Sequence, residues 1–292
     1  MKPSLFDYLT PSSITEAAKA MHENPGAMVI AGGQSLVPAL NFKLAGPSML
    51  IDILRIPDLD TIHIDDTEIV VGARVRHCDI ESNQEIGRVH PIMQEAMAYV
   101  AHAPIRNRGT VVGSICHADA AAEMPLMLVL NDGYVTAASV DGSRTIVARD
   151  FFKFHMTTSR KPHEIITTAH FPLPVAGSGY SFQEFARRSG DYAVAAIGTL
   201  MTLNSDGSVD SIKVAGCGIA ACPIRLDAVE EAVAGSALSD NDLDSAVQAL
   251  AEYVTAPDDM HATNDYRKHL AGKLLSKSLV EAKERALERV SL

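Results

Sequence analysis

The sequence has little of what nucleic-acid-binding, membrane-spanning or exported proteins need. Its 25 lysines and arginines are outnumbered by 36 aspartates and glutamates, for a formal net charge of -11, whereas nucleic-acid binding depends on a basic surface. No apolar run approaches the roughly 20 residues that a membrane-spanning helix requires. The N-terminal segment has no apolar signal-peptide core. We therefore expect a cytoplasmic protein with no nucleic-acid partner and no membrane span.

The chain also lacks grouped metal ligands and the short motifs of several enzyme classes. Its four cysteines form no C-x-x-C pair: Cys78, Cys116, Cys217 and Cys222. Iron–sulfur clusters and zinc sites need grouped ligands, so we expect no metal site and four unpaired thiols that pack as small apolar groups. His102 and His117 lack metal-binding spacing and are expected to be ordinary polar or core residues. No G-x-S-x-G, G-x-x-x-x-G-K-[ST] or H-E-x-x-H motif is present.

One apparent nucleotide-binding motif is rejected. Residues Gly216–Ala221 match the pattern G-x-G-x-x-A. A nicotinamide-binding fold would continue with a helix, a strand and an acidic residue about 20 positions on. Pro223 follows the motif almost at once, and no apolar strand comes after the helical pattern near Arg225–Val233. The segment therefore does not indicate a nicotinamide site.

What the sequence does contain is an alternation of short strand and helix patterns, which predicts an α+β fold. Hairpins are expected at Asp65–Thr67, Asp141–Gly142 and Asp206–Gly207, where turn residues separate apolar runs. A capping-box pattern from Ser13 to Glu16 predicts a helix, and the strand after it, at 27–30, is expected to be buried. A mixed N-terminal part should therefore be followed by a hairpin sheet and C-terminal helices.

Two prolines and two glycines between Pro172 and Gly179 predict a linker. We place a domain boundary there, with an N-terminal domain of residues 1–175 and a C-terminal domain of residues 176–292.

An abrupt change of pattern marks the first candidate site. An apolar strand stops at Gly32 and Gly33, and a helix-like apolar run begins after Gln34 and Ser35. Glycine permits positive φ angles and close approach of a ligand, and successive N–H groups in such a loop can bind an anion. A tight turn that uses glycine for its conformation alone is the alternative. In so acidic a chain, a bound phosphate would be held by backbone amides rather than by a lysine cluster.

A second glycine-punctuated loop is expected at residues 109–114, followed by Asp119 and Glu123 around a helix start. The hydroxyls of Thr110 and Ser114 can donate to phosphate, and a carboxylate can accept from ribose hydroxyls. The alternative is a surface turn with Asp119 as a helix N-cap. Two such loops in one domain fit a ligand that has both a pyrophosphate and a sugar, which is a dinucleotide.

The segments 31–53 and 105–125 resemble the FAD-binding medium subunit of the molybdenum hydroxylases, the family of xanthine, carbon monoxide and N-heteroaromatic dehydrogenases. Segments 187–198 and 265–282 are similar to it too, so the resemblance covers nearly the whole chain. It implies a two-subdomain FAD-binding domain of the PCMH type, with subdomains of about 1–57 and 58–175. A C-terminal domain of the CO dehydrogenase flavoprotein type would follow, with a three-stranded antiparallel sheet and helices.

The resemblance implies a place in an oxidoreductase complex, a dimer of heterotrimers. A large subunit would hydroxylate the substrate at a molybdenum cofactor, and a small subunit would carry two two-iron–two-sulfur clusters. This chain would take their electrons onto FAD and pass them to an external acceptor. A self-contained FAD-dependent oxidoreductase on a similar domain is the alternative, but it needs an acid or base over the flavin, and none is evident. A relative that has lost FAD is favoured by Val112 alone.

Carried over by position, the resemblance implies the residues of the FAD site, with no catalytic residue and no metal ligand among them. They are Val29, Ile30, Ala31, Gly32, Gly33, Gln34, Ser35, Leu36, Val100, Thr110, Val111, Val112, Gly113, Ser114, Glu123, Ile165, Ile166, Gln183 and Tyr192. The first loop, 29–36, would wrap the pyrophosphate and lie closest to it at its two glycines. Residues 110–114 would form a second phosphate-side loop. Glu123 would lie near the adenosine, Ile165 or Ile166 beside the flavin, and the Tyr192 ring over the isoalloxazine.

Two positions depart from the family pattern. Val112 replaces a glycine that the family usually has, and valine would be strained there if the backbone needed a positive φ angle. Gln183 stands where some relatives have a lysine near the flavin, which leaves the charge over the ring open.

Overall fold

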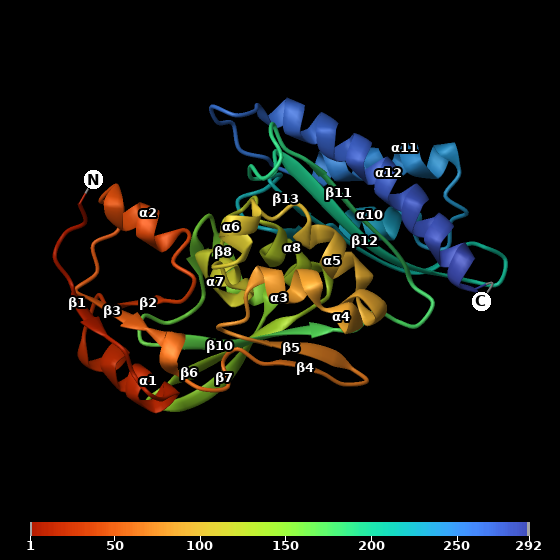
Figure 1. Cartoon of the computed structure of the whole chain (residues 1–292). Helices are drawn as coiled ribbons and strands as arrows, with labels where there is room; N and C mark the ends of the chain where they lie inside the picture. Colours follow the sequence, from red (N-terminus) through yellow and green to blue (C-terminus); the bar gives the residue numbers. More distant parts are fainter. Residues whose placement is uncertain (1, 291–292) are drawn as a thin grey trace.

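The computed structural model describes residues 2–290, and its elements follow one another in three groups along the chain (Figure 1). The first group is a small parallel sheet in the order β1-β3-β2 with short helices beside it. Its elements are β1 (Asp7–Leu9), α1 (Ile14–Glu23), β2 (Met28–Ile30), α2 (Leu36–Asn41), β3 (Met49–Asp52) and the 3-10 helix η1 (Ile53–Arg55).

The start of α1 follows the predicted capping pattern only in part. Ser13 is the N-cap and accepts a hydrogen bond from the Glu16 backbone, as expected, but the Glu16 carboxylate accepts from Ser12. Strand β2 was expected to be buried, yet Met28 is 38% exposed. The prediction of a buried strand is wrong because this sheet has only three strands and β2 is at its edge.

The second group is a five-stranded antiparallel sheet in the order β4-β5-β10-β6-β7. Its strands are β4 (Ile62–Ile64), β5 (Glu68–Gly72), β6 (Tyr134–Ser139), β7 (Gly142–Val147) and β10 (Ile165–Pro172). Two of the predicted hairpins, at Asp65–Thr67 and Asp141–Gly142, are confirmed as β4–β5 and β6–β7. The strand ending at the prolines is also confirmed, since β10 ends at Pro172.

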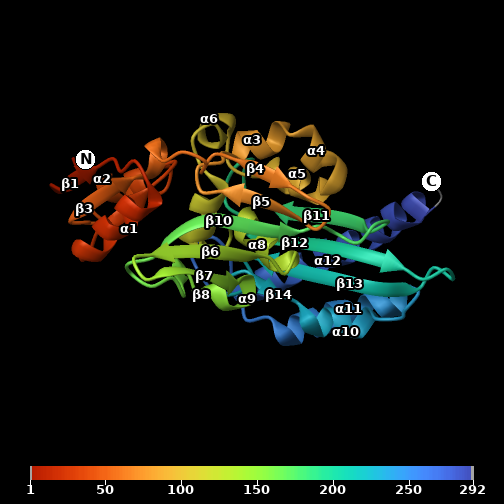
Figure 2. The same cartoon turned by 90° about the horizontal axis from the view of Figure 1, so that it is seen from below.

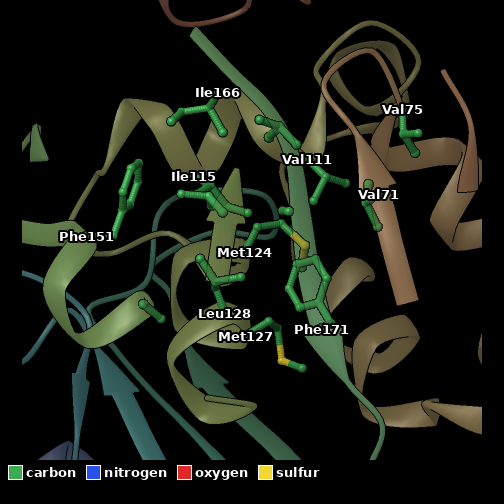
Figure 3. Close-up of a cluster of buried hydrophobic side chains, with 14 of the residues drawn as sticks. Val71, Val75, Val111, Ile115, Met124, Met127, Leu128, Phe151, Ile166 and Phe171 are labelled. Atoms are coloured by element: carbon green, nitrogen blue, oxygen red, sulfur yellow. The ribbon is translucent and has the colours of Figure 1, made fainter. Parts of the chain in front are cut away.

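Six short helices connect β5 to β6. They are α3 (His77–Ser82), α4 (Gln84–Val89), α5 (Pro91–Met97), α6 (Ala103–Arg106), α7 (Val111–His117) and α8 (Glu123–Leu130). A short segment with α9 (Ala148–Phe151), β8 (Phe152–Phe154) and β9 (Thr157–Thr158) follows β7. All eight residues of α8 are buried. Met124, Met127 and Leu128 of α8 pack with Ile115 of α7 and Phe171 of β10 in the core (Figure 3).

The third group is a four-stranded antiparallel sheet in the order β11-β12-β13-β14, with three helices. Its elements are β11 (Gly179–Phe185), β12 (Ala195–Leu203), β13 (Val209–Cys217), β14 (Ile224–Arg225), α10 (Asp227–Val233), α11 (Asp240–Tyr253) and α12 (Asn264–Val290). The predicted hairpin at Asp206–Gly207 is confirmed as β12–β13. The predicted three-stranded sheet gains a fourth strand, β14, which has only two residues and no marked apolar pattern of its own.

The long helix α12 lies across β11 and β12, as Figure 1 shows. Its approach is close because Gly179 has no side chain, and a Cβ there would come within 1.8 Å of the Ala282 carbonyl oxygen. On the other side of this sheet, α8 lies between the four-stranded and five-stranded sheets (Figure 2). A Cβ at Gly198 of β12 would meet Leu130 of α8 at 2.9 Å. The segment between β10 and β11 contains the predicted linker, and the division at residue 175 stays a prediction.

Candidate functional site

The first predicted site connects β2 to α2. Gly33 has a φ angle of +70°, a conformation that glycine adopts without strain and other residues rarely adopt. Within residues 2–290, the backbone N–H groups of Gly32 to Leu36 donate to no backbone or side-chain acceptor. Unpaired N–H groups that follow one another in a loop form a binding place for an anion. The loop therefore fits the pyrophosphate that the sequence predicts.

The close neighbour of Gly32 is the chain itself. A Cβ at Gly32 would lie 2.3 Å from the Arg108 carbonyl oxygen and 2.7 Å from Gly109 Cα. Behind Gly109 lies His77, which is 5% exposed and whose backbone N–H donates to the Gly109 carbonyl at 3.1 Å. The two glycine motifs thus touch backbone to backbone. The expectation that a pyrophosphate is what excludes a side chain at Gly32 is wrong, because the Arg108–Gly109 peptide already fills that position.

The second predicted site is a helix start rather than a loop. Residues Val111 to Ser114 form the first turn of α7, and Thr110 is its N-cap, with its hydroxyl accepting from the Gly113 N–H at 3.1 Å. The Ser114 N–H donates to the Thr110 carbonyl. The expectation of a second glycine-punctuated loop is therefore wrong in its conformation. The two glycines suggested a loop, but the N-cap bond of Thr110 starts a helix instead.

Helix α7 also accounts for Val112. This residue is 2% exposed, packs in the core and is absent from the positive-φ residues. Valine is unstrained in this helical backbone, so the departure from the family pattern gives no reason to expect loss of the cofactor.

Three acidic side chains gather at the contact between the second and third groups of elements. Asp119, after α7, and Glu123, at the start of α8, are 7% and 5% exposed. The Asp119 carboxylate accepts from the Ala121 N–H at 2.9 Å, whereas the N-cap of α8 is Ala122. The alternative reading of Asp119 as that N-cap is wrong, since its side chain closes the turn before the helix. Glu184 of β11 supplies the third carboxyl group, and its Oε2 is buried without a partner within residues 2–290.

Burial and like-charge repulsion raise the pKa values of the two glutamates in this cluster. Burial raises the pKa of Glu184 to about 9, with a further contribution from the charge of Glu123. Burial likewise raises the pKa of Glu123 to about 7, and the Asp119 charge adds to the effect. No lysine or arginine forms an ion pair with Glu123 or Glu184 in the described part of the chain. Glu184 therefore remains protonated at neutral pH.

Tyr192 joins this cluster to the first loop. Its side chain interacts with the Ser35 hydroxyl, and burial together with the charges of Asp119 and Glu123 raises its pKa to about 12. The residue as a whole is 52% exposed, so part of its surface is open to a ligand, while its hydroxyl lies toward Ser35 and the acids. Ser35, Glu123 and Tyr192, which are far apart in sequence, thus lie around one place.

Other predicted residues lie in the core or face elsewhere. Val100, Ile165 and Ile166 are at most 7% exposed, and Ile166 points into the apolar cluster of Figure 3. Val29 and Ala31 pack against the same cluster. These residues can offer a ligand backbone atoms and little side-chain surface.

Gln183 faces α12 instead. Its amide donates to Ser181 Oγ at 3.0 Å and to the Glu281 carboxylate. Because neighbours on a strand point to opposite faces, it is Glu184 that faces the acid cluster. The sequence analysis missed Glu184, although this alternation along β11 would have separated it from Gln183.

Two further observations concern metal ligands and membrane-spanning helices. Among residues 2–290 there is no group of three or more His, Cys, Asp and Glu side chains arranged to hold a metal ion. None of the helices in that range has the length and apolar character needed to cross a membrane.

Comparison with known proteins gives matches over nearly the whole chain. The family described as FAD binding domain in molybdopterin dehydrogenase matches residues 4–174. CO dehydrogenase flavoprotein C-terminal domain matches residues 180–282. The 6-hydroxypseudooxynicotine dehydrogenase complex subunit alpha of Paenarthrobacter nicotinovorans is 38% identical, over 98% of this chain and 97% of its own. The nicotine 6-hydroxylase medium subunit of the same organism is 36% identical, over 97% and 99%.

Solved structures agree with these relatives. Quinoline 2-oxidoreductase from Pseudomonas putida 86 superimposes with a TM-score of 0.94 at 30% identity, covering 98% of this chain and all 100% of the other. Carbon monoxide dehydrogenase from Hydrogenophaga pseudoflava gives the same TM-score of 0.94, also at 30% identity, over 98% and 99%. The resemblance noted in the sequence and the predicted fold class are confirmed. The chain therefore belongs to the family of FAD-binding subunits of the molybdopterin dehydrogenases, and it is an FAD-binding subunit of an oxidoreductase.

Proposed function

We propose that this chain relays electrons within a molybdenum hydroxylase complex. It takes electrons from the two-iron–two-sulfur clusters of a small partner subunit, which receives them from a large subunit that oxidises the substrate at a molybdenum cofactor. It holds them on FAD and passes them to an external acceptor. Support comes from the family match, from relatives whose names include medium subunits and medium chains, and from cysteines too scattered to bind clusters here. We further propose a dimer of heterotrimers in the cytoplasm.

The observation that carries this proposal is the meeting of Ser35 and Tyr192. A loop of unpaired amides, suited to a pyrophosphate, lies beside an exposed aromatic ring that a flavin can stack on. FAD, when bound, supplies the chemistry that accepts and releases electrons. The amides of Gly32 to Leu36 would hold its phosphates, and Glu123 would bind a ribose hydroxyl. With a pKa of about 7, Glu123 can either donate to that hydroxyl or accept from it.

The remaining predicted residues would contact the cofactor around these central groups. Residues 29–31 would line the entry to the loop, and Thr110 keeps a hydroxyl hydrogen that can be donated to a phosphate. Val100, Ile165 and Ile166 would lie on the core side of the flavin and contact it by backbone and apolar atoms.

The test of the relay is an anaerobic titration of the purified chain. Expressed alone, it should be yellow with about one FAD per chain, and candidate N-heteroaromatic, aldehyde or carbon monoxide substrates should leave its flavin absorbance unchanged. Addition of the large and small subunits should make one of these substrates bleach the flavin. A lone chain that bleaches and turns over with an organic substrate would replace the relay by a self-contained oxidoreductase.

One observation favours that second function. Glu184 is a buried, protonated carboxyl group with an unpartnered oxygen beside Glu123, and a self-contained flavoenzyme needs an acid or base of this kind near its substrate. The titration of the lone chain separates the two functions.

A prediction for Tyr192 tests the place of the flavin. Tyr192→Ala should remove the stacked ring and shift the visible spectrum and redox potential of the bound flavin. Tyr192→Phe, the matched control, keeps the ring and loses only the contact with Ser35, so it should stay close to the wild-type spectrum. An alanine variant with unchanged spectrum, potential and reoxidation rate would place the ring away from the flavin.

A further inference from the structure

Arg267 is a buried arginine near the start of α12. It lies in segment 265–282, which resembles the family but contributes no residue to the proposed cofactor site. Arg267 is 4% exposed. Its Nη1 donates to the Val194 carbonyl at 2.7 Å and to the Gly218 carbonyl at 2.8 Å, and its Nη2 donates to Asp259 Oδ2 at 2.7 Å. A buried arginine with a single carboxylate partner and two carbonyl partners organises the backbone that supplies those carbonyls.

The two carbonyls belong to the chain segments that approach the candidate site. Val194 lies two residues after Tyr192, just before β12. Gly218 follows β13, and its N–H donates at 2.7 Å to the carbonyl of Ala120, next to Asp119. Arg267 therefore holds, through one guanidinium, the segment that carries Tyr192 and the segment that binds the acidic turn.

The fit at Gly218 leaves little room for adjustment. Gly218 has a φ angle of +74°, and a Cβ there would lie 2.7 Å from the Val194 carbonyl oxygen and 2.9 Å from that of Ala193. The two segments are thus packed backbone against backbone, and the carbonyl oxygens of Val194 and Gly218 both accept from Arg267 Nη1. The partial negative charges of these two carbonyl oxygens repel each other, and the positive charge of the guanidinium between them offsets this repulsion.

We propose that Arg267 is a positioning residue for the cofactor site: it fixes the Tyr192 segment and, through Gly218, the Asp119–Ala122 turn against each other. This rests on the proposed place of FAD between Ser35, Glu123 and Tyr192. Arg267 itself touches none of these side chains, so it acts on the cofactor only through the backbone that it orders.

Lysine is the informative substitution because it keeps the charge and loses the geometry. A guanidinium presents its donors in a planar fork, whereas an ammonium group on a shorter reach cannot satisfy Val194, Gly218 and Asp259 at once. The matched control is Arg225→Lys. Arg225 is also buried, at 8% exposed, and donates to Asp132 at 2.6 Å and to Glu230. Asp132 follows the C-terminal end of α8, whereas the Asp119–Ala122 turn precedes its N-terminal end, so Arg225 acts at the opposite end of this helix.

The experiment compares Arg267→Lys and Arg225→Lys in the full chain by three measurements. Urea unfolding gives the loss of stability, hydrogen exchange follows the amides of 119–122 and 190–194, and fluorescence titration gives the dissociation constant of FAD. In Arg267→Lys we expect exchange in both segments to accelerate about tenfold or more, as the loss of one charge-assisted bond predicts. FAD affinity should fall by about the same factor. In Arg225→Lys, hydrogen exchange in these two segments and FAD affinity should change only as much as the loss of global stability measured by urea unfolding explains.

Each outcome decides a different claim. If both variants change exchange and FAD affinity in proportion to their loss of stability, Arg267 is merely structural and the proposal is overturned. If wild-type apoprotein fails to bind FAD, the proposed function fails, but the exchange comparison still decides whether Arg267 orders the two segments. If Arg267→Lys does not fold, Arg267→Gln replaces it, because a glutamine amide cannot donate to the Val194 and Gly218 carbonyls in the same way; unchanged exchange at 119–122 and 190–194 in that variant would also overturn the proposal.

Discussion

Replacing Gly33 by valine is expected to leave the purified chain with little bound FAD. Gly33 has a φ angle of +70°, and a Cβ there would already meet Val37 Cγ2 at 3.2 Å. A β-branched residue at this angle is strained by about 1–3 kcal/mol. The loop can relieve that strain by turning its free N–H groups, from Gly32 to Leu36, away from their present direction. Binding of an anion to these groups should weaken at least about tenfold for each 1.4 kcal/mol of strain that remains in the bound state.

The flavin-to-protein absorbance ratio after purification measures this effect, and Gly177→Val is its control. Gly177 has a φ angle of +80° and nothing within 4 Å of an added Cβ, so valine there imposes similar backbone strain in the linker. We expect Gly177→Val to lose stability but retain FAD. Full FAD occupancy in Gly33→Val would mean that the pyrophosphate is not held by this loop.

The local parts of the fold were predictable because short-range chemistry determines them. Asp141 and Gly142 lie at the β6–β7 turn, and Asp206 and Gly207 lie in the β12–β13 turn; both glycines have positive φ angles, which glycine supplies in tight turns without strain. Ser13 caps α1 for an equally local reason. Each of these features depends on residues within a few positions of one another, so the sequence pattern contains all the necessary information.

The glycine motifs show where local patterns are insufficient. Gly32 and Gly109 were each interpreted as places where a ligand approaches the backbone, but at Gly32 the approaching group is the Arg108–Gly109 peptide. A glycine in a sequence pattern indicates that a side chain would not fit at that position, but it does not identify the group that would clash with it. The same pattern also concealed the start of α7, because Gly113 accompanies a Thr110 N-cap bond rather than a loop.

Glu184 was missed for a related reason. The resemblance drew attention to Gln183, whose amide in the structure is bonded to Ser181 and Glu281. The acid cluster brings together residues from the turn after α7, the start of α8 and β11, and such a meeting depends on how the sheets pack. Burial of Glu184 against Glu123, and hence its raised pKa, could not be foreseen before that packing was known.

Glu184 should make the native chain less stable as the pH rises through the neutral range. The pKa of an unpaired glutamate is 4.5, and that of Glu184 in the folded chain is about 9. Between these values the native state keeps a proton that the unfolded state has lost, so stability falls by up to about 1.4 kcal/mol per pH unit. Below pH 4.5 the group contributes no dependence, and above its folded pKa the loss is complete. Glu184→Gln keeps the neutral shape and removes this dependence.

The measurement is the free energy of unfolding in urea from pH 6 to pH 8, compared between wild type and Glu184→Gln. The stability of the variant relative to wild type should rise across this range by about 2.7 kcal/mol, given a slope near the limit for one proton. Glu123, Tyr99 and Cys217 face Glu184, and Asp119 lies beside Glu123; all four are retained in the variant. Burial lowers the pKa values of His77 and His90 from 6.5 to about 4 in the folded chain, so their titration in the unfolded chain also affects stability in this range. Both histidines are present in wild type and variant, and their contribution therefore cancels in the difference.

Glu16→Gln provides the control for this pH dependence because its carboxylate is perturbed in the opposite direction. Hydrogen bonds from Ser12 lower the pKa of Glu16 below its usual 4.5, so its contribution is fully present above that value and is lost only at lower pH. The difference between Glu16→Gln and wild type should therefore stay constant from pH 6 to pH 8. If Glu184→Gln also gives a constant difference, Glu184 is ionised in the folded chain across this range. The cluster would then need a counter-charge that the described residues do not supply, and the assignment of Glu184 as a protonated acid beside the flavin would be wrong.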